Sequence, residues 1–123
     1  MKLHLDRATT LNAITGYGEG YVMVNGQRFE RSLVILPERI LLDWPATSFE
    51  ALAPEHLAAL AGLDREIILL GTGPRLRFPR PEVLQPLMRS GVGVEVMDMQ
   101  AACRTYNILL AEERRVAAAL LIG

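Results

Sequence analysis

The stretch with the most evident chemical potential is residues 71–81, which read GTGPRLRFPRP. Two glycines allow a tight turn, and three arginines follow among prolines and apolar residues. Guanidinium groups bind carboxylates and phosphates through paired hydrogen bonds, and α/β sheets commonly hold ligands in the loop that follows a buried strand. The residues of interest are Gly71, Gly73, Arg75, Arg77 and Arg80. The pattern predicts either an anion-binding loop or, more simply, a solvated loop whose arginines balance nearby acids.

The glycine spacing also resembles the start of a dinucleotide-binding turn, in which a pyrophosphate lies between the glycine turn and the next helix. The position three residues after Gly73 is Leu76, where the dinucleotide motif needs a third glycine. The proline-rich residues 74–81 also hold the next helix away from the turn. We therefore interpret Gly71 and Gly73 mainly as the place where the chain turns out of the sheet, with nucleotide binding as the weaker alternative.

A second set of polar residues follows the next apolar run, VEVM at 94–97. Asp98 ends that run, and Arg104 and Asn107 share one face of the helix predicted after it. If the two apolar runs are adjacent parallel strands, the Asp98 turn lies near the Gly71 turn. A polar ligand site could form there. Helix capping and surface solvation are the simpler interpretation of the same residues.

Cys103 is the only cysteine, which excludes an internal disulfide and a multi-cysteine metal site. It lies near the start of a helix, where a thiol can become reactive. However, it belongs to the apolar stripe of that helix, and the carboxylate of Asp98 would oppose a thiolate. His4 and His56 stand alone in the sequence. We expect Cys103 to be buried and structural, and we predict no catalytic residue, metal or cofactor.

The elements that must position these residues fall into two halves. In the first half, residues 21–30 form two β-prone runs around Asn25 and Gly26, the dipeptide most suited to a type I′ hairpin turn. A second hairpin joins SLVIL at 32–36 to RILLDW at 39–44, with Pro45 ending the strand. The first half is therefore predicted to be antiparallel β structure.

The second half alternates strands and helices. We expect a helix from Pro54 to a left-handed cap at Gly62, a helix bent at Pro86 that ends near Gly91, and a third helix capped by Asp98. The intervening apolar runs predict buried strands at 66–70, 94–97 and 116–122. Helical crossovers make such strands parallel neighbours.

Composition and charge limit the class of protein. A chain of 123 residues is expected to form one domain, with hairpins over 1–46 and alternating helices and strands over 47–123. The formal net charge of −1 argues against a general nucleic-acid binder. The N-terminus lacks a signal-peptide pattern, and no apolar run has the length of a membrane helix. We expect a cytoplasmic bacterial protein without membrane insertion.

Four segments in order resemble a known family: GTG at 71–73, GVEVMD at 93–98, ACRTYN at 102–107 and RRVAAAL at 114–120. They are similar to the domain-of-unknown-function family that contains the mitochondrial respiratory complex I assembly factor 3. The resemblance implies a three-layer α/β domain with a mixed, largely parallel central sheet and a smaller antiparallel β portion from the N-terminal half. It offers no catalytic residues to transfer.

Two functional hypotheses follow. The leading one is a non-enzymatic interaction module that works like an assembly factor, through contacts with a protein partner. The alternative is a small-ligand binding protein or enzyme that holds an anionic or nucleotide-like group at the carboxyl ends of the parallel strands. Its candidate ligand-binding residues are Gly71, Gly73, Arg75, Arg77, Asp98, Arg104 and Asn107.

Overall fold

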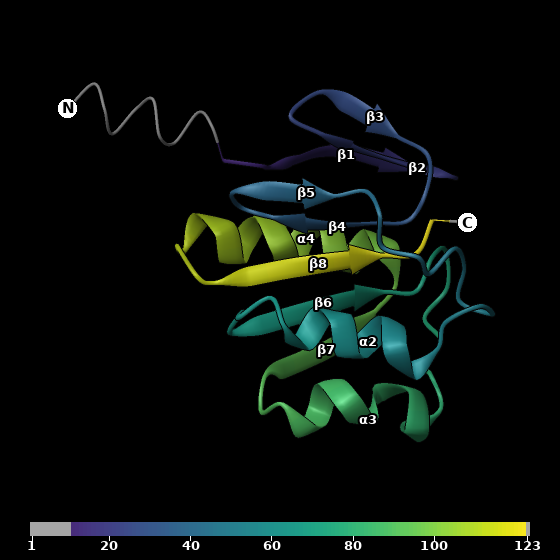
Figure 1. The fold of residues 1–123 in the computed structure, drawn as a ribbon. Coiled ribbons are helices and arrows are strands. Elements are labelled where there is room, and N and C mark those ends of the chain that lie inside the picture. The colour runs from purple at the N-terminus through teal and green to yellow at the C-terminus, as the bar shows by residue number, and fades with distance from the viewer. Residues whose placement is uncertain (1–10, 123) are drawn as a thin grey trace.

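A five-stranded sheet forms the centre of the molecule, as seen in the computed structural model, which describes residues 11–122 (Figure 1). The strands lie in the order β5 (Arg39–Leu41), β4 (Leu33–Leu36), β8 (Val116–Leu120), β6 (Ile67–Gly71) and β7 (Gly93–Met97). β8, β6 and β7 are parallel, whereas β4 runs antiparallel to both β5 and β8. The sheet is therefore mixed, and its three strands from the second half of the chain are parallel, as predicted.

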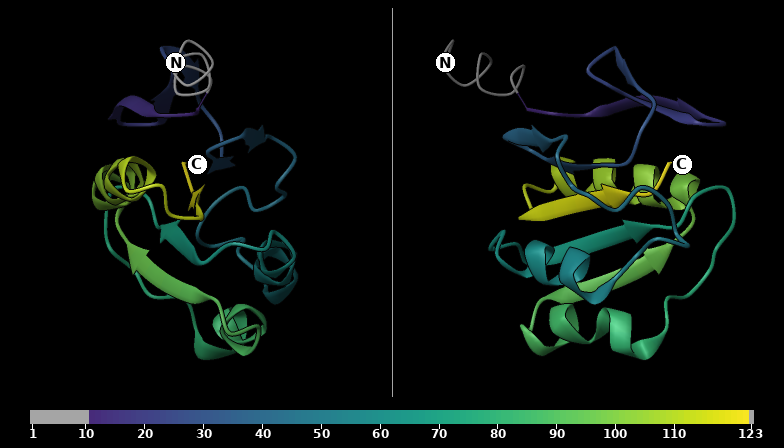
Figure 2. Two further views of the ribbon diagram at one scale, coloured as in Figure 1. Left: turned by 90° about the vertical axis from the view of Figure 1, so that its left-hand side faces the viewer. Right: turned by 45° about the vertical axis from the view of Figure 1, so that its right-hand side comes forward.

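Helices cover both faces of this sheet, so the fold has three layers (Figure 2). α2 (Pro54–Ala61) and α3 (Pro81–Arg89) pack on one face, and α4 (Met99–Ala111) packs on the other. The alternation of strand side chains produces the two cores. In β6, for example, Ile68 and Leu70 face α2 and α3, while Leu69 faces α4. The predicted three-layer α/β fold is confirmed.

The small antiparallel sheet contains β1 (Ile14–Gly18), β2 (Tyr21–Val24) and β3 (Gln27–Phe29). It packs on the α4 side through Ile14, Val22 and Val24. The predicted hairpin is present, with φ of 50° at Asn25 and 83° at Gly26. These positive angles are those of a type I′ turn, which matches the twist of the flanking strands.

Two details differ from the sequence expectations. β1 is an additional strand, which the sequence does not predict because ITGYG contains two glycines and lacks a clear alternation. The expected left-handed cap at Gly62 is wrong, since its φ is −78° and its N–H bonds to the Ala59 carbonyl in a right-handed turn. The positive φ occurs two residues later, at Asp64.

The helix starts agree with their sequence signals. Pro54 and Pro81 occupy the first turns of α2 and α3, where their missing N–H is not needed. At α4, the Asp98 carboxylate accepts a hydrogen bond from the Ala101 N–H at 2.8 Å. The expectations for residues 1–10, which include His4 and the signal-peptide region, lie outside the described residues.

Candidate functional site

The two predicted turns lie side by side at the carboxyl edge of the parallel strands. Gly71 at the end of β6 is the register partner of Met97 at the end of β7. Beyond the strands, the Thr72 N–H donates to the Met97 carbonyl at 2.9 Å, and the Met99 N–H donates to the Gly73 carbonyl at 2.8 Å. The predicted juxtaposition of the two strand exits is confirmed.

Gly71 and Gly73 serve different purposes at this edge. A Cβ at Gly71 would lie 2.8 Å from Leu120 Cδ2 and 3.2 Å from the Cβ of Ala102, so its absence lets β8 and α4 pack closely. Gly73 has a φ of +98°, which glycine adopts without strain. Only Gly73 therefore acts as the expected turn residue, and Gly71 is a packing position within β6.

Thr72, between the two glycines, organises the following loop and is absent from the residues predicted from the sequence. It is buried, and its hydroxyl donates to the Arg75 carbonyl at 2.6 Å and accepts from the Arg77 N–H at 3.1 Å. The signal available in the sequence is a threonine in a glycine-rich turn, where hydroxyl groups commonly bond to nearby backbone. Thr72 thereby fixes the path of the chain from residue 72 to residue 77.

Arg77 is held by residues of the loop that precedes α2. Its guanidinium forms an ion pair with Glu50 at 2.7 Å and lies 4.3 Å from the ring centre of Phe49. The hydrogen bond from Arg77 lowers the pKa of the Glu50 carboxyl, and the positive charges of Arg77 and Arg75 add to this effect. The two arginines therefore gather near Glu50, on the face of the sheet covered by α2 and α3.

The polar residues of α4 are used on the opposite face. Asn107 Oδ1 accepts from the Ile14 N–H at 2.9 Å, and its Nδ2 donates to the Ile14 carbonyl at 2.7 Å. The side-chain amide thus bonds to β1 as a neighbouring strand would. Asp98 caps its own helix, and Arg104 is exposed to solvent. Arg77 and Asn107 are separated by the sheet, so the seven candidate residues do not form one cluster; ligand binding by any of them stays a prediction.

Cys103 and Tyr106 are buried in the core beneath α4. Burial raises the pKa of the Cys103 thiol to about 12 and also raises the pKa of the Tyr106 hydroxyl. The Tyr106 hydroxyl donates to the Asn12 carbonyl at 2.7 Å. A thiol with such a pKa is almost fully protonated at neutral pH, as expected for a structural cysteine.

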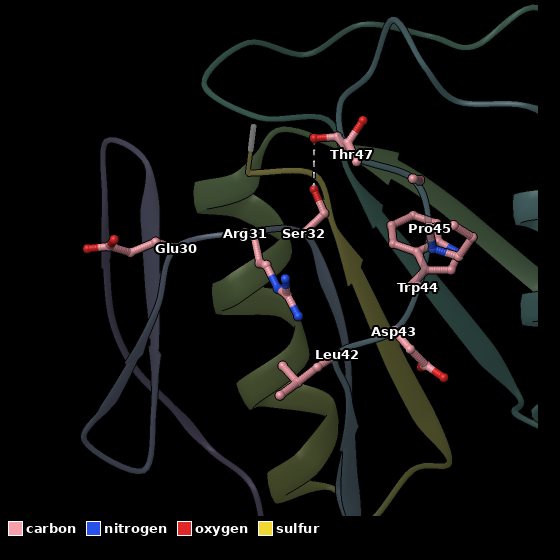
Figure 3. A pocket seen from close by; sticks show the side chains of 9 residues that line it. Glu30, Arg31, Ser32, Leu42, Asp43, Trp44, Pro45 and Thr47 are labelled. Atoms are coloured by element: carbon pink, nitrogen blue, oxygen red, sulfur yellow. Dashed lines mark hydrogen bonds between the residues drawn. The ribbon is translucent and has the colours of Figure 1, made fainter.

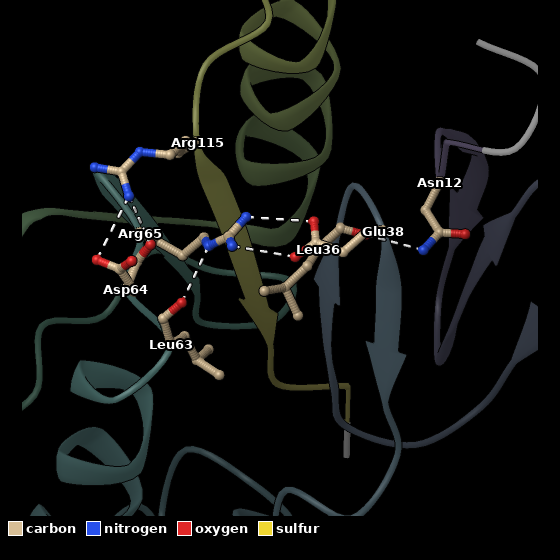
Figure 4. Close-up of polar contacts among 7 residues, drawn as sticks. All are labelled: Asn12, Leu36, Glu38, Leu63, Asp64, Arg65 and Arg115. Atoms are coloured by element: carbon tan, nitrogen blue, oxygen red, sulfur yellow. Dashed lines mark hydrogen bonds and ion pairs between the residues drawn. The ribbon is translucent and has the colours of Figure 1, made fainter. Parts of the chain in front are cut away.

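A second polar cluster lies at the other end of the sheet (Figure 4). Arg65 pairs with Glu38 at 3.1 Å and donates to the Leu63 carbonyl at 3.2 Å. Nearby, Asn12 Nδ2 donates to the Leu36 carbonyl at 2.9 Å. These contacts connect the turn between β4 and β5 to the turn before β6 and to the start of the small sheet. The cluster joins separate elements, so we interpret its role as structural.

Three surface hollows are relevant to binding. A groove of about 410 Å³ lies between the loop before α2 and the loop before α3, with Phe49, Phe78 and Val83 among its walls. A hollow of about 340 Å³ lies beside Leu42 and Trp44, near the end of β5 (Figure 3). A smaller hollow of about 200 Å³ lies beside the start of α4, and Gly73 and Met99 are among the residues that line it.

Two further observations concern residues 11–122. No group of three or more His, Cys, Asp or Glu side chains in this range is placed to hold a metal ion. Among the helices in the same range, none has both the length and the apolar character needed to cross a bilayer.

The chain is similar to proteins from several organisms. It is 33% identical over 122 residues to the "NADH dehydrogenase [ubiquinone] 1 alpha subcomplex assembly factor 3" of Xenopus tropicalis, covering 98% of this chain and 66% of that protein. It is 26% identical over 106 residues to the "13 kDa major membrane protein" of Francisella tularensis, covering 85% of this chain and 86% of that protein. The chain spans about two thirds or less of the length of the assembly-factor relatives.

A solved structure confirms the fold. The crystal structure of a protein from Bordetella parapertussis superposes with a TM-score of 0.84 at 48% identity, covering 93% of this chain and 98% of that one. Residues 14–121 match the family described as "Protein of unknown function (DUF498/DUF598)". This match extends from β1 to the end of β8, so the chain belongs to that family, which also contains the complex I assembly factor homologues.

Proposed function

We propose that this protein is a non-enzymatic, assembly-factor-like module that acts in the cytoplasm through contacts with other proteins. The observation that carries the proposal is the similarity to NADH dehydrogenase assembly factor 3, which extends over 98% of this chain. Because the aligned residues include the helices on both faces of the sheet, the similarity extends over the whole three-layer fold. We further propose that the process it assists is the assembly of NADH dehydrogenase.

The side-chain geometry supports a role in contacts. Several polar residues that the sequence suggests for a ligand site bond to other parts of the chain, as with Asn107 to Ile14 and Arg77 to Glu50. Large apolar side chains are exposed instead, at Leu42, Leu76, Phe78, Met88 and Ile108. Contiguous exposed apolar groups commonly mark surfaces that meet another molecule, and of these residues Leu76 and Phe78 are near neighbours in the loop before α3.

The test is deletion of the gene in the organism that encodes the chain, followed by native gel electrophoresis of solubilised membranes. We expect less assembled NADH dehydrogenase in the deletion strain, with NADH oxidation by the membranes reduced in proportion. A plasmid copy of the gene should restore both. An unchanged amount of assembled enzyme in the deletion strain would contradict the proposed role in assembly.

A small-ligand function is the second candidate, and one observation favours it. Gly73 lines the hollow of about 200 Å³ at the start of α4, at the edge of the sheet where α/β proteins commonly bind ligands. Calorimetric titration with ADP and with inorganic phosphate tests this candidate. Saturable binding by the wild-type protein would support it, and absence of binding would count against it.

A further inference from the structure

The extended segment that leads into α3 has a reversed pattern of exposure. Side chains alternate in direction along such a segment. Pro79 is buried, and the partly exposed Arg77 lies over the Phe49 ring and pairs with the exposed Glu50. Leu76 and Phe78 face solvent and are 50% and 69% exposed. An ordinary surface loop would place its arginine outside and its leucine and phenylalanine inside, so this face is suited to meeting an apolar environment.

The segment is held in this arrangement by bonds at its start and by its own composition. The Thr72 hydroxyl bonds to the Arg75 carbonyl and the Arg77 N–H, and the Arg77 side chain is anchored to Glu50. Prolines at 74, 79 and 81 restrict the backbone further. Because the chain is already ordered, presenting the two apolar side chains to a binding surface costs little conformational entropy.

Two positive charges flank the apolar pair. Arg75 and Arg80 are both exposed, and residues 74–81 contain three arginines and no acidic residue, although the whole chain has a formal net charge of −1. The nearest acids are accounted for by contacts: Glu50 pairs with Arg77 at 2.7 Å, and Glu82 lies 3.8 Å from Arg80. Three arginines and these two acids leave a surplus of one positive charge beside the exposed Leu76 and Phe78.

We infer that the face formed by Arg75, Leu76, Phe78 and Arg80 binds the surface of a membrane that contains anionic lipids. Leu76 and Phe78 enter the boundary between headgroups and acyl chains, and Arg75 and Arg80 contact lipid phosphates. Apolar insertion combined with electrostatic attraction is the usual basis of reversible membrane binding, and each basic residue near an anionic surface adds to it. This inference goes beyond the proposed assembly function and does not depend on it.

The shape of the loop favours a lipid surface over a protein pocket as the occupant. The segment between β6 and α3 runs along the outer margin of the molecule (Figure 2, right). Phe78 and Arg80 line the neighbouring groove, whereas Leu76 and Arg75 lie outside it, so the proposed face extends from the groove onto the open surface beside it. A fluid interface adapts to projecting side chains, whereas a protein partner would need a matching pocket.

Flotation of the purified protein with protein-free vesicles tests the inference. The probes are vesicles of phosphatidylcholine alone and vesicles of phosphatidylcholine with about a third phosphatidylglycerol. We expect binding to the anionic vesicles that weakens as salt increases. Replacing Leu76 and Phe78 together by serine should lower the partition coefficient roughly 10-fold or more. The double change Arg75→Gln and Arg80→Gln should lower it by a similar factor on anionic vesicles only.

The matched control is Ile108→Ser, which removes another exposed apolar side chain, 58% exposed on the outer face of α4. This variant should bind vesicles like the wild-type protein. Thermal unfolding of every variant checks that the fold is retained. Absence of flotation by the wild-type protein, or equal binding by the wild type and the Leu76/Phe78 variant, would overturn the inference. Because the vesicles contain no protein, the result is independent of whether a partner protein exists.

Discussion

Helix α4 and the loop before α3 leave the same edge of the sheet, yet they use their side chains in opposite ways. On α4, the polar groups of Asp98 and Asn107 bond to the protein's own backbone. In the loop, Arg77 pairs with Glu50 while Leu76 and Phe78 face solvent. Polar residues at the rim of a parallel sheet can therefore be structural, while an apolar pair beside them is the part available to another molecule.

Close packing on the α4 side gives the largest expected effect on stability. Gly71→Ala places a Cβ 2.8 Å from Leu120 Cδ2 and 3.2 Å from the Cβ of Ala102. Both of these neighbouring residues are fully buried. We expect the free energy of unfolding to fall by about 2–3 kcal/mol, measured by urea titration. Gly16→Ala is the control, since its Cβ would meet Met23 at an ordinary 3.7 Å. Equal stability of both variants would show that the approach of α4 to β6 is not tight.

The bond between α4 and β1 should contribute less. Asn107→Ala removes both hydrogen bonds to Ile14 and should lower the free energy of unfolding by about 1–2 kcal/mol. Hydrogen exchange of the Ile14 amide should become faster. Arg104→Ala, at an exposed position of the same helix, should change stability by less than about 0.5 kcal/mol. If Asn107→Ala left the free energy of unfolding unchanged while Arg104→Ala lowered it strongly, the structural role of Asn107 would be contradicted.

The buried thiol on the α4 side predicts a dependence of stability on pH. Burial raises the pKa of Cys103 from its ordinary value of 9.0 to about 12, so the unfolded chain releases this proton at a lower pH than the folded one. The contribution is fully present below pH 9.0 and is lost as the pH rises toward 12. We expect the loss to be about 1 kcal/mol per pH unit within that window.

Urea titrations at several alkaline pH values measure this loss. Cys103→Ala should reduce the slope of stability against pH, although the buried Tyr106, whose pKa is also raised, keeps part of it. A thiol reagent should modify Cys103 only when the protein unfolds. Rapid modification of the native protein would show that the thiol is accessible.

The smallest expected effect on stability comes from the loop. Phe78→Ser removes a side chain that is 69% exposed, so the free energy of unfolding should change by less than about 0.5 kcal/mol. If this variant is as stable as the wild type but does not restore assembled NADH dehydrogenase, the loop differs from α4 as we propose. A large loss of stability would mean that Phe78 belongs to the core and is not a contact residue.

Much of the fold follows from local signals in the sequence. Asn25 and Gly26 specify a tight hairpin turn, Pro54 and Pro81 start helices, and Asp98 caps α4. These features depend on the conformational preferences of a few neighbouring residues, which a single sequence contains. β1 escapes prediction because Gly16 and Gly18 remove the alternating pattern that identifies strands.

The candidate site is harder to predict because its contacts are distant in the sequence. Asn107 bonds to Ile14, 93 residues away, and Arg77 bonds to Glu50, 27 residues away. Helix periodicity places Asn107 on a face of α4, but only the docking of the small sheet decides what that face meets. Similarly, the sequence identifies the arginines of residues 71–81, whereas the contacts of Arg77 depend on the loop before α2.

If lipid binding by the loop face around Phe78 serves the proposed assembly function, then assembly needs this face and does not need a polar site on α4. The most direct test is complementation of the deletion strain with Phe78→Ser or with Ile108→Ser, each produced at the wild-type level. We predict that Ile108→Ser restores assembled NADH dehydrogenase on native gels and that Phe78→Ser does not. Full restoration by Phe78→Ser would contradict the proposed role of the loop.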